Sequence, residues 1–201
     1  MDLLSKDIIG ILAAVILFIS YGPYLYGLIK GRVKPHIFTW GIWGLMMSIS
    51  FFAQISDGAG AGAWVTGLGA LITLSIALIG YLKHIENLHD ITKLDTFSIL
   101  SCFLVLPIWY FTGSALVAAV SVAAIDAIAY IPTFRKGYRQ PYKESIPTYL
   151  IGSVSFYLSV MALGKYSVIT MAYPMTFATM NLLLCIFLLW RRSVTDRPSI
   201  S

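Results

Sequence analysis

Charged residues are scarce in this chain of 201 residues. Asp, Glu, Lys and Arg make up only 11% of it and hydrophobic residues 58%, whereas a soluble domain carries about 25% charged residues. A chain of this length cannot bury so much apolar surface in one aqueous core. The composition therefore excludes an ordinary soluble domain and indicates an integral membrane protein.

Cysteine and histidine are also sparse. Cys102 and Cys185 both lie inside apolar runs, which is typical of small core residues rather than of a disulfide. The three histidines, His36, His84 and His89, do not have the spacing of metal ligands. The sequence shows no nucleophile–base pair and no phosphate-binding loop. We therefore expect no enzymatic activity, no metal and no cofactor.

Long apolar runs are what the chain has in abundance. A helix needs about 20 residues to cross about 30 Å of hydrocarbon. Runs of that order cover residues 8–29, 37–56, 63–82, 96–112, 114–134, 145–163 and 168–190. The fourth run is the shortest and contains Pro107. The sequence thus predicts an all-α membrane protein with seven transmembrane helices.

Basic residues are distributed unevenly among the predicted loops. Seven spans place 12 of the 14 Lys and Arg residues on one side of the membrane and only Lys6 and Lys165 on the other. Because cytoplasmic loops are enriched in Lys and Arg, we expect the N-terminus outside and the C-terminus inside. The net charge of +5 then reflects membrane topology, and we expect no nucleic-acid partner.

A stretch near the start of the chain recurs 109 positions later. Residues 21–53 and 130–162 share eight identities without a gap. Apolar segments often have identical residues by chance, because they use few residue types. Two of these identities, however, are a proline (Pro23 and Pro132) and a lysine (Lys34 and Lys143). This pattern favours an internal duplication of three helices.

The duplication predicts a division of the chain. We expect a first three-helix repeat in residues 1–84, a cytoplasmic loop and linker helix in 85–113, a second three-helix repeat in 114–192, and a cytoplasmic tail in 193–201. The odd linker helix lets both triplets enter the membrane in the same direction, as parallel repeats require.

This plan of three, one and three helices, with a proline in the first helix of each triplet and a basic turn after it, resembles the SWEET or PQ-loop (MtN3) transporter superfamily. The Pro-Gln pair of that family appears here as Pro23-Tyr24 and Pro132-Thr133. Residues 65–70, Val-Thr-Gly-Leu-Gly-Ala, are similar to the Val-Asn-Gly-x-Gly-Ala of the sugar carriers. Thr66 stands where the resemblance implies a substrate-binding Asn, and Tyr173 lies near the equivalent place in the last helix.

The Trp-bearing second helix also resembles the PnuC-type nicotinamide riboside carriers, which share this architecture. Either resemblance implies a carrier that alternates access around a site near the midplane of the membrane, between the triplets. The resemblance to the PnuC type assigns no substrate-binding residue in this chain.

Two polar side chains stand deep inside predicted spans. Asp126 is the only acidic residue at such depth, and insertion scales put its cost at about 2.5–3.5 kcal/mol. It would bind a cationic or hydroxylated solute, carry a proton, or act as a structural carboxylate bonded to Ser or Tyr. Asn181 is the second such group. It would either contact the substrate or form a hydrogen bond between helices, and the sequence favours neither role over the other.

Aromatic rings and prolines complete the candidate site. Trp43 and Phe156 would form flat walls for a ring-shaped solute, although Trp residues also mark membrane interfaces. Pro23 and Pro132 each free a carbonyl one turn back, and their equal heights favour a hinge or gate over a passive kink.

We therefore expect a carrier for a small polar or aromatic solute (sugar, nucleoside, vitamin or amino acid) in the plasma (inner) membrane, working as a uniporter or with proton coupling. The alternative is a seven-helix receptor or sorting protein that binds a ligand without transporting it, as the ER retention receptors do. A retinal photoreceptor is disfavoured because residues 168–190 contain no lysine for a Schiff base. Homo-oligomerisation stays open.

Overall fold

The computed structural model describes residues 3–31, 37–83, 100, 107 and 110–195. Within these ranges the regular elements are all helical. They are α1 (Leu3–Ile29), α2 (Ile37–Ser56), α3 (Trp64–Leu82), α5 (Ala115–Arg139), α6 (Ile146–Met161) and α7 (Val168–Ser193), with the short 3₁₀ helices η1 (Gly60–Ala63) and η3 (Pro141–Lys143). The all-α prediction is confirmed for this part of the chain.

Four helical segments are long and apolar enough to cross a membrane. They are Ser5–Ile29, Gly60–Leu82, Ala115–Arg139 and Val168–Ser193. The protein is therefore built as an integral membrane protein. Helices α2 and α6 coincide with two further predicted spans, whereas most of the predicted fourth span, 96–112, lies outside the described residues.

Local sequence explains where several helices begin and end. Gly31 and Gly58 follow α1 and α2 with φ values of 69° and 82°, a left-handed conformation that glycine adopts without strain. Pro147 lies in the first turn of α6, where a missing N–H costs nothing. Ser167 caps α7, accepting a hydrogen bond from the backbone N–H of Thr170.

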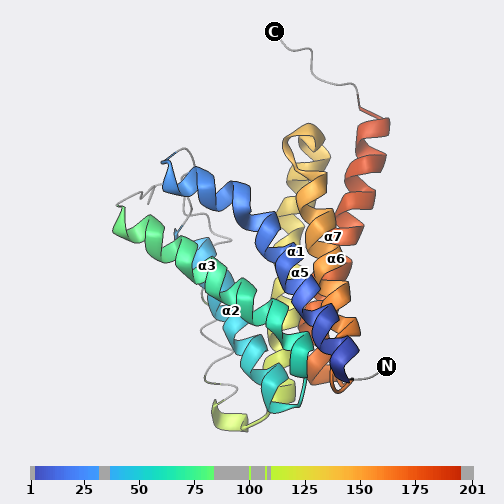
Figure 1. Ribbon diagram of the computed structural model, residues 1–201. Coiled ribbons are helices and arrows are strands. Elements are labelled where there is room, and N and C mark those ends of the chain that lie inside the picture. Colours follow the sequence, from blue (N-terminus) through green and yellow to red (C-terminus); the bar gives the residue numbers. More distant parts are fainter. Residues whose placement is uncertain (1–2, 32–36, 84–99, 101–106, 108–109, 196–201) are drawn as a thin grey trace.

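The helices pack as two triplets with the same internal order. In the first triplet α3 packs against both α1 and α2, and in the second α7 packs against both α5 and α6. Between the triplets, α1 packs against α6 and α2 against α5. Figure 1 shows α1, α3, α5 and α7 running in one direction and α2 and α6 in the other. Duplication of a three-helix unit in parallel would produce this pattern.

The alternating directions give the bundle two unlike ends. One end, called the basic end below, holds the last residues of α1, α3, α5 and α7 and carries Lys30, Lys83, Arg135, Arg139, Arg191 and Arg192. The opposite end, called the Lys6 end, holds the first turns of α1 and α7 together with η1, and carries Lys6 and Lys165. The charge bias seen in the sequence is thus a difference between the ends of one bundle.

The triplets approach closely at the Lys6 end, and Gly62 makes this approach feasible. A Cβ on Gly62 would lie 2.8 Å from both Leu163 Cα and Ser159 O. We expect Gly62→Ala to lower the free energy of unfolding by about 1–3 kcal/mol, because backbone must move to accept the methyl group.

Gly41 provides the matched control for this substitution. It lies within α2, and a Cβ there would meet no atom within 4 Å outside the neighbouring residues and the helix backbone. Gly41→Ala should leave stability unchanged or raise it by up to about 1 kcal/mol. Thermal unfolding of both variants in detergent micelles checks the pair, and equal melting temperatures would show that the contact at Gly62 is not close.

Candidate functional site

Asp126 is the acidic side chain of the membrane-spanning part of α5. It is only 4% exposed, and its Oδ2 atom is buried and accepts no hydrogen bond from any described residue. A buried carboxylate oxygen without a partner is costly, and such groups in membrane helices mark functional sites. The structure therefore places the strongest sequence candidate inside the bundle rather than against lipid.

Two tyrosines, one from each triplet, lie within electrostatic range of this carboxyl group. Tyr21 on α1 and Tyr130 on α5 both interact electrostatically with Asp126 and with each other. Asp126 therefore lies where the two triplets face one another. Tyr21 and Tyr130 were not among the predicted site residues, although both copies of the repeat carry a tyrosine at this position, which was the signal that could have found them.

An aromatic cluster adjoins each tyrosine. In the first triplet, the ring of Tyr21 lies 6.1 Å from that of Trp40, and Trp40 Nε1 donates a 3.0 Å hydrogen bond to the Tyr24 hydroxyl. In the second triplet, the ring of Tyr130 lies 6.3 Å from that of Phe177, which packs 4.4 Å from Phe156. Asp126 thus interacts with one tyrosine of each aromatic cluster.

Three predicted site residues lie in the second triplet near this cluster. Phe156 and Tyr173 are fully buried and their ring centroids are 6.2 Å apart. Asn181 is buried against α6, where its Nδ2 atom lies 3.3 Å from the position of a Cβ on Gly152. The described surroundings of Asn181 are those of a contact between α6 and α7, whereas Asp126 lies between the triplets.

Two predicted site residues lie in the first triplet. Trp43 is 40% exposed, with its ring 5.5 Å from that of Trp40. Thr66 is buried between α2 and α3 and shares hydrogen bonds with Gln54, whose Nε2 also donates to Ser50 Oγ. The hydroxyl of Thr66 is therefore engaged in a polar network inside the first triplet.

Helix α1 changes packing partners along its length. Ala13 and Leu17 belong to the central core that all six helices share, whereas Leu28 packs with Ile72 and Ile76 of α3. Pro23 lies between these two halves, and Figure 1 shows the helix bending between them. A proline frees a backbone carbonyl and permits such a bend. Position 132 lies within α5, and its side chain is outside the described residues.

The Lys6 end is closed by hydrogen bonds between the triplets. Lys6 Nζ donates to Leu163 O at 2.6 Å, Ser155 Oγ to Ala13 O at 2.9 Å, Ser159 Oγ to Gly62 O at 2.7 Å, and Gly164 N to Ala59 O at 2.8 Å. Each bond joins α1 or the α2–α3 connection to α6 or the α6–α7 connection. The contact surface between the triplets, called the seam below, is therefore held together by hydrogen bonds at this end.

Asp57 completes the closure at the Lys6 end. Its Oδ1 atom lies 2.5 Å from Lys165 Nζ, and its Oδ2 atom accepts a hydrogen bond from Ser167 Oγ. Ser167 is also the N-cap of α7, so one hydroxyl group joins the helix start of the second triplet to the first triplet. We call the group formed by Asp57, Lys165 and Ser167 the latch.

The latch should make stability depend on pH. The hydrogen bond from Lys165, followed by the one from Ser167, holds the pKa of Asp57 below its ordinary value. A carboxyl group with a lowered folded-state pKa stabilises the protein above its unfolded-state pKa of about 3.9, and the contribution is lost as the pH falls below that value.

Asp57→Asn tests this dependence. We expect the variant to melt slightly below the wild type at pH 7, by a small amount because water screens the pair. The difference should shrink progressively as the pH falls below about 4. Melting curves between pH 3 and pH 7 check the prediction, and a constant difference across that range would contradict it.

At the basic end, the described hydrogen bonds join residues of the same triplet. Lys83 Nζ donates to Ile29 O at 2.8 Å in the first triplet, and Arg191 Nε donates to Tyr138 O at 2.9 Å in the second. Arg192 donates to the carbonyl oxygens of Pro141 and Glu144, again within the second triplet. Figure 1 shows α1 and α3 diverging from α5, α6 and α7 toward this end.

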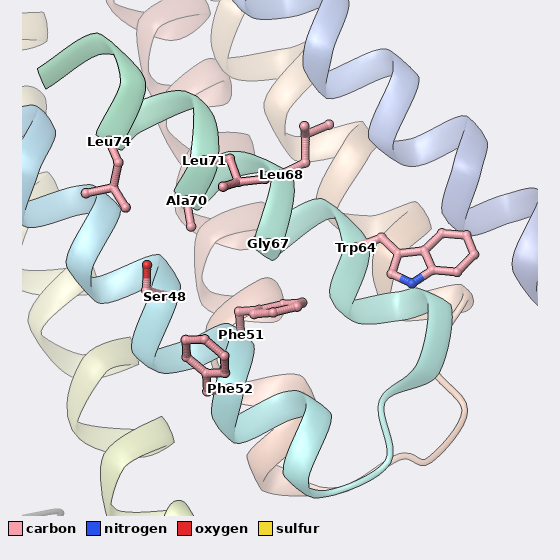
Figure 2. A pocket seen from close by; sticks show the side chains of 9 residues that line it. All are labelled: Ser48, Phe51, Phe52, Trp64, Gly67, Leu68, Ala70, Leu71 and Leu74. Atoms are coloured by element: carbon pink, nitrogen blue, oxygen red, sulfur yellow. The ribbon is translucent and has the colours of Figure 1, made fainter. Parts of the chain in front are cut away.

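A groove of about 390 Å³ lies on the outer surface, between α2 and α3. Figure 2 shows its lining, which is almost wholly apolar and includes Phe51, Phe52 and Leu71. Phe52 and Leu71 are more than half exposed, as expected of side chains that face lipid. The groove contains none of the predicted site residues, so we do not regard it as the functional site.

Comparison of the chain with protein-family models, with curated proteins and with solved structures finds no match. Within the described residues, no three His, Cys, Asp or Glu side chains gather in a way that could hold a metal ion. The candidate site is therefore defined by Asp126 and the tyrosines and rings on either side of it.

Proposed function

We propose that the protein is a membrane carrier that moves a small polar or aromatic solute by alternating access. The observation that carries this proposal is that the two ends of the bundle differ in the hydrogen bonds between the triplets. Hydrogen bonds cross between them at the Lys6 end, whereas those described at the basic end stay within one triplet. Alternating access requires two such bodies and a seam that opens at one end while the other is closed.

The position of Asp126 supports the same function. A carrier holds its solute between the two bodies, near the middle of the membrane. Asp126, Tyr21 and Tyr130 interact across the seam between the triplets, as a solute site in that position requires. Pro23 lies where α1 passes from the central core to its packing against α3, and it would act as the hinge.

The charge bias assigns the ends of the bundle to the two sides of the membrane. We infer that the basic end is cytoplasmic and the Lys6 end faces outward, with seven spans, N-terminus out and C-terminus in. The conformation described above is then closed to the outside. The resemblance of the sequence to the SWEET and PQ-loop carriers supports this plan of three, one and three helices.

The proposal can be tested without knowing the solute, by measuring distances at both ends of one molecule. Spin labels at positions 30 and 139 report on the basic end, and labels at 56 and 166 report on the Lys6 end, in a protein whose two cysteines are replaced by serine. Lys165→Gln removes the ion pair of the latch. Because water screens this exposed ion pair, the ratio of closed to open molecules should fall only modestly.

A carrier predicts a reciprocal response to this substitution. The distance between positions 56 and 166 should lengthen while that between positions 30 and 139 shortens. Lys83→Gln is the matched control, because it removes a lysine hydrogen bond within the first triplet and should leave both distances unchanged. A change at the Lys6 end alone would instead favour a receptor or sorting protein that binds a ligand from one side.

A further inference from the structure

Asp126 presents a buried carboxyl oxygen without a hydrogen-bond partner to the seam between the triplets. Its Oδ2 atom is buried without a hydrogen-bond donor, and within the described ranges no basic side chain forms an ion pair with it. The basic residues of the bundle lie at its two ends, where Lys165 is paired with Asp57. Because a carboxylate buried in this way is stable only when a positive partner or a proton neutralises it, either a bound cation or a proton would serve as that partner.

The surroundings of Asp126 are aromatic rather than rich in free polar groups. Tyr21 and Tyr130 interact electrostatically with the carboxyl group, and the rings of Trp40 and Phe177 lie next to these tyrosines. Ring faces attract cations, most strongly where water is excluded. A carboxyl group near several aromatic rings is therefore a combination that recognises a positively charged group attached to an apolar or aromatic body.

We propose that the solute of this carrier is an organic cation, an amine or a quaternary ammonium compound, whose charged nitrogen binds Asp126 between Tyr21 and Tyr130. This inference rests on the proposed carrier function and specifies its substrate class. The nitrogen supplies the positive partner that Oδ2 lacks, and the nearby ring faces attract its N–H or N-methyl groups.

Other solute classes fit the described groups less well. A sugar needs several free hydrogen-bonding side chains, but Thr66, Gln54 and Ser50 bond to one another. An anionic solute would be repelled by the carboxylate. A proton would also neutralise Asp126, but it would make no use of the rings on both sides. The experiment must therefore separate an organic cation from a proton and from a neutral solute.

Pairs of probes that differ only in charge make this separation. We would measure the melting temperature of the purified wild-type protein at constant pH with tyramine and its neutral analogue tyrosol, and with choline and its neutral analogue 3,3-dimethylbutan-1-ol. At a cation concentration about 100 times its dissociation constant, we expect a rise of about 5–10 °C. The neutral partner of the same pair should give no rise at the same concentration.

Two variants and one control locate the binding. Asp126→Asn should weaken cation binding by at least about tenfold, because a charge-assisted contact is lost. Phe177→Leu removes a ring but no charge, and should weaken binding less. Asp7→Asn is the control, because Asp7 is an exposed carboxylate in the first turns of α1. It should bind cations as the wild type does.

Each outcome decides the inference. A rise with cations only, lost in Asp126→Asn, supports it. Equal rises with the neutral analogues, no rise with either cation, or a rise that persists in Asp126→Asn would overturn it. If Asp126→Asn does not fold, the comparison of charged and neutral probes on the wild type and on Phe177→Leu still decides. The distance measurements are independent, so reciprocal motion without cation binding would overturn the substrate class and leave the carrier standing.

Discussion

Asp126→Asn should abolish most transport while leaving the protein at least as stable as the wild type. The loss should be at least about tenfold, since contacts to a charged group contribute about 1.5–3 kcal/mol. Stability should hold or rise, because the substitution replaces a buried carboxylate that has an unpartnered oxygen with a neutral amide of the same shape. Loss of transport without loss of stability is what distinguishes a functional side chain from a structural one.

Vesicle uptake and thermal unfolding of the same preparation measure the two effects together. The probe for uptake is the solute that raises the melting temperature of the wild type most. Asp7→Asn, on the exposed first turns of α1, should leave uptake and stability unchanged. If Asp126 were only structural, Asp126→Asn would lower the melting temperature, and uptake per folded molecule would equal that of the wild type.

A disulfide across the latch should stop transport completely and reversibly. A Cβ on Gly58 would lie 4.0 Å from Lys165 Cβ, within the 3.5–4.5 Å that disulfides span. Oxidation of the Gly58→Cys/Lys165→Cys variant, in a background without the two native cysteines, would bind the triplets together at the Lys6 end. We expect uptake to fall to background on oxidation and to recover on reduction, because the seam can then no longer open at that end.

The single variants control for the substitutions themselves. Gly58 has a φ of 82°, so Cys at this position costs about 1–2 kcal/mol in backbone strain. Gly58→Cys alone therefore shows how much activity this strain removes, and neither single variant should respond to oxidant. Full uptake by the oxidised, cross-linked double variant would show that the Lys6 end does not open during transport.

Hydrophobic length alone predicted the six long helices that the structure describes, with bounds within five residues. The run 168–190 corresponds to α7 (Val168–Ser193), and the run 145–163 to α6 (Ile146–Met161). The agreement has a simple cause. In hydrocarbon every backbone group must be bonded within its own segment, so a long apolar run forms a helix.

The burial of Asp126 was also predictable, because its cost in lipid is independent of the details of packing. By contrast, the side chains that accompany it were not. Trp43 and Phe156 were predicted to line one pocket, yet Trp43 is 40% exposed and Phe156 is fully buried in the central core. A membrane helix is apolar on its lipid face and on its packed face alike, so hydrophobicity does not tell one from the other.

The sequence by itself thus determined the helical class, the membrane environment, the charge difference between the two ends and the depth of Asp126. Tertiary structure alone decided that Asp57 meets Lys165 across 108 residues, that Thr66 bonds to Gln54, and that Tyr21 reaches Asp126 from the other triplet. The physical reason is that solvation acts on each segment separately, so it can be read along the chain. Hydrogen bonds and ring contacts between triplets depend on how the helices are rotated and tilted against one another, which only their packing sets.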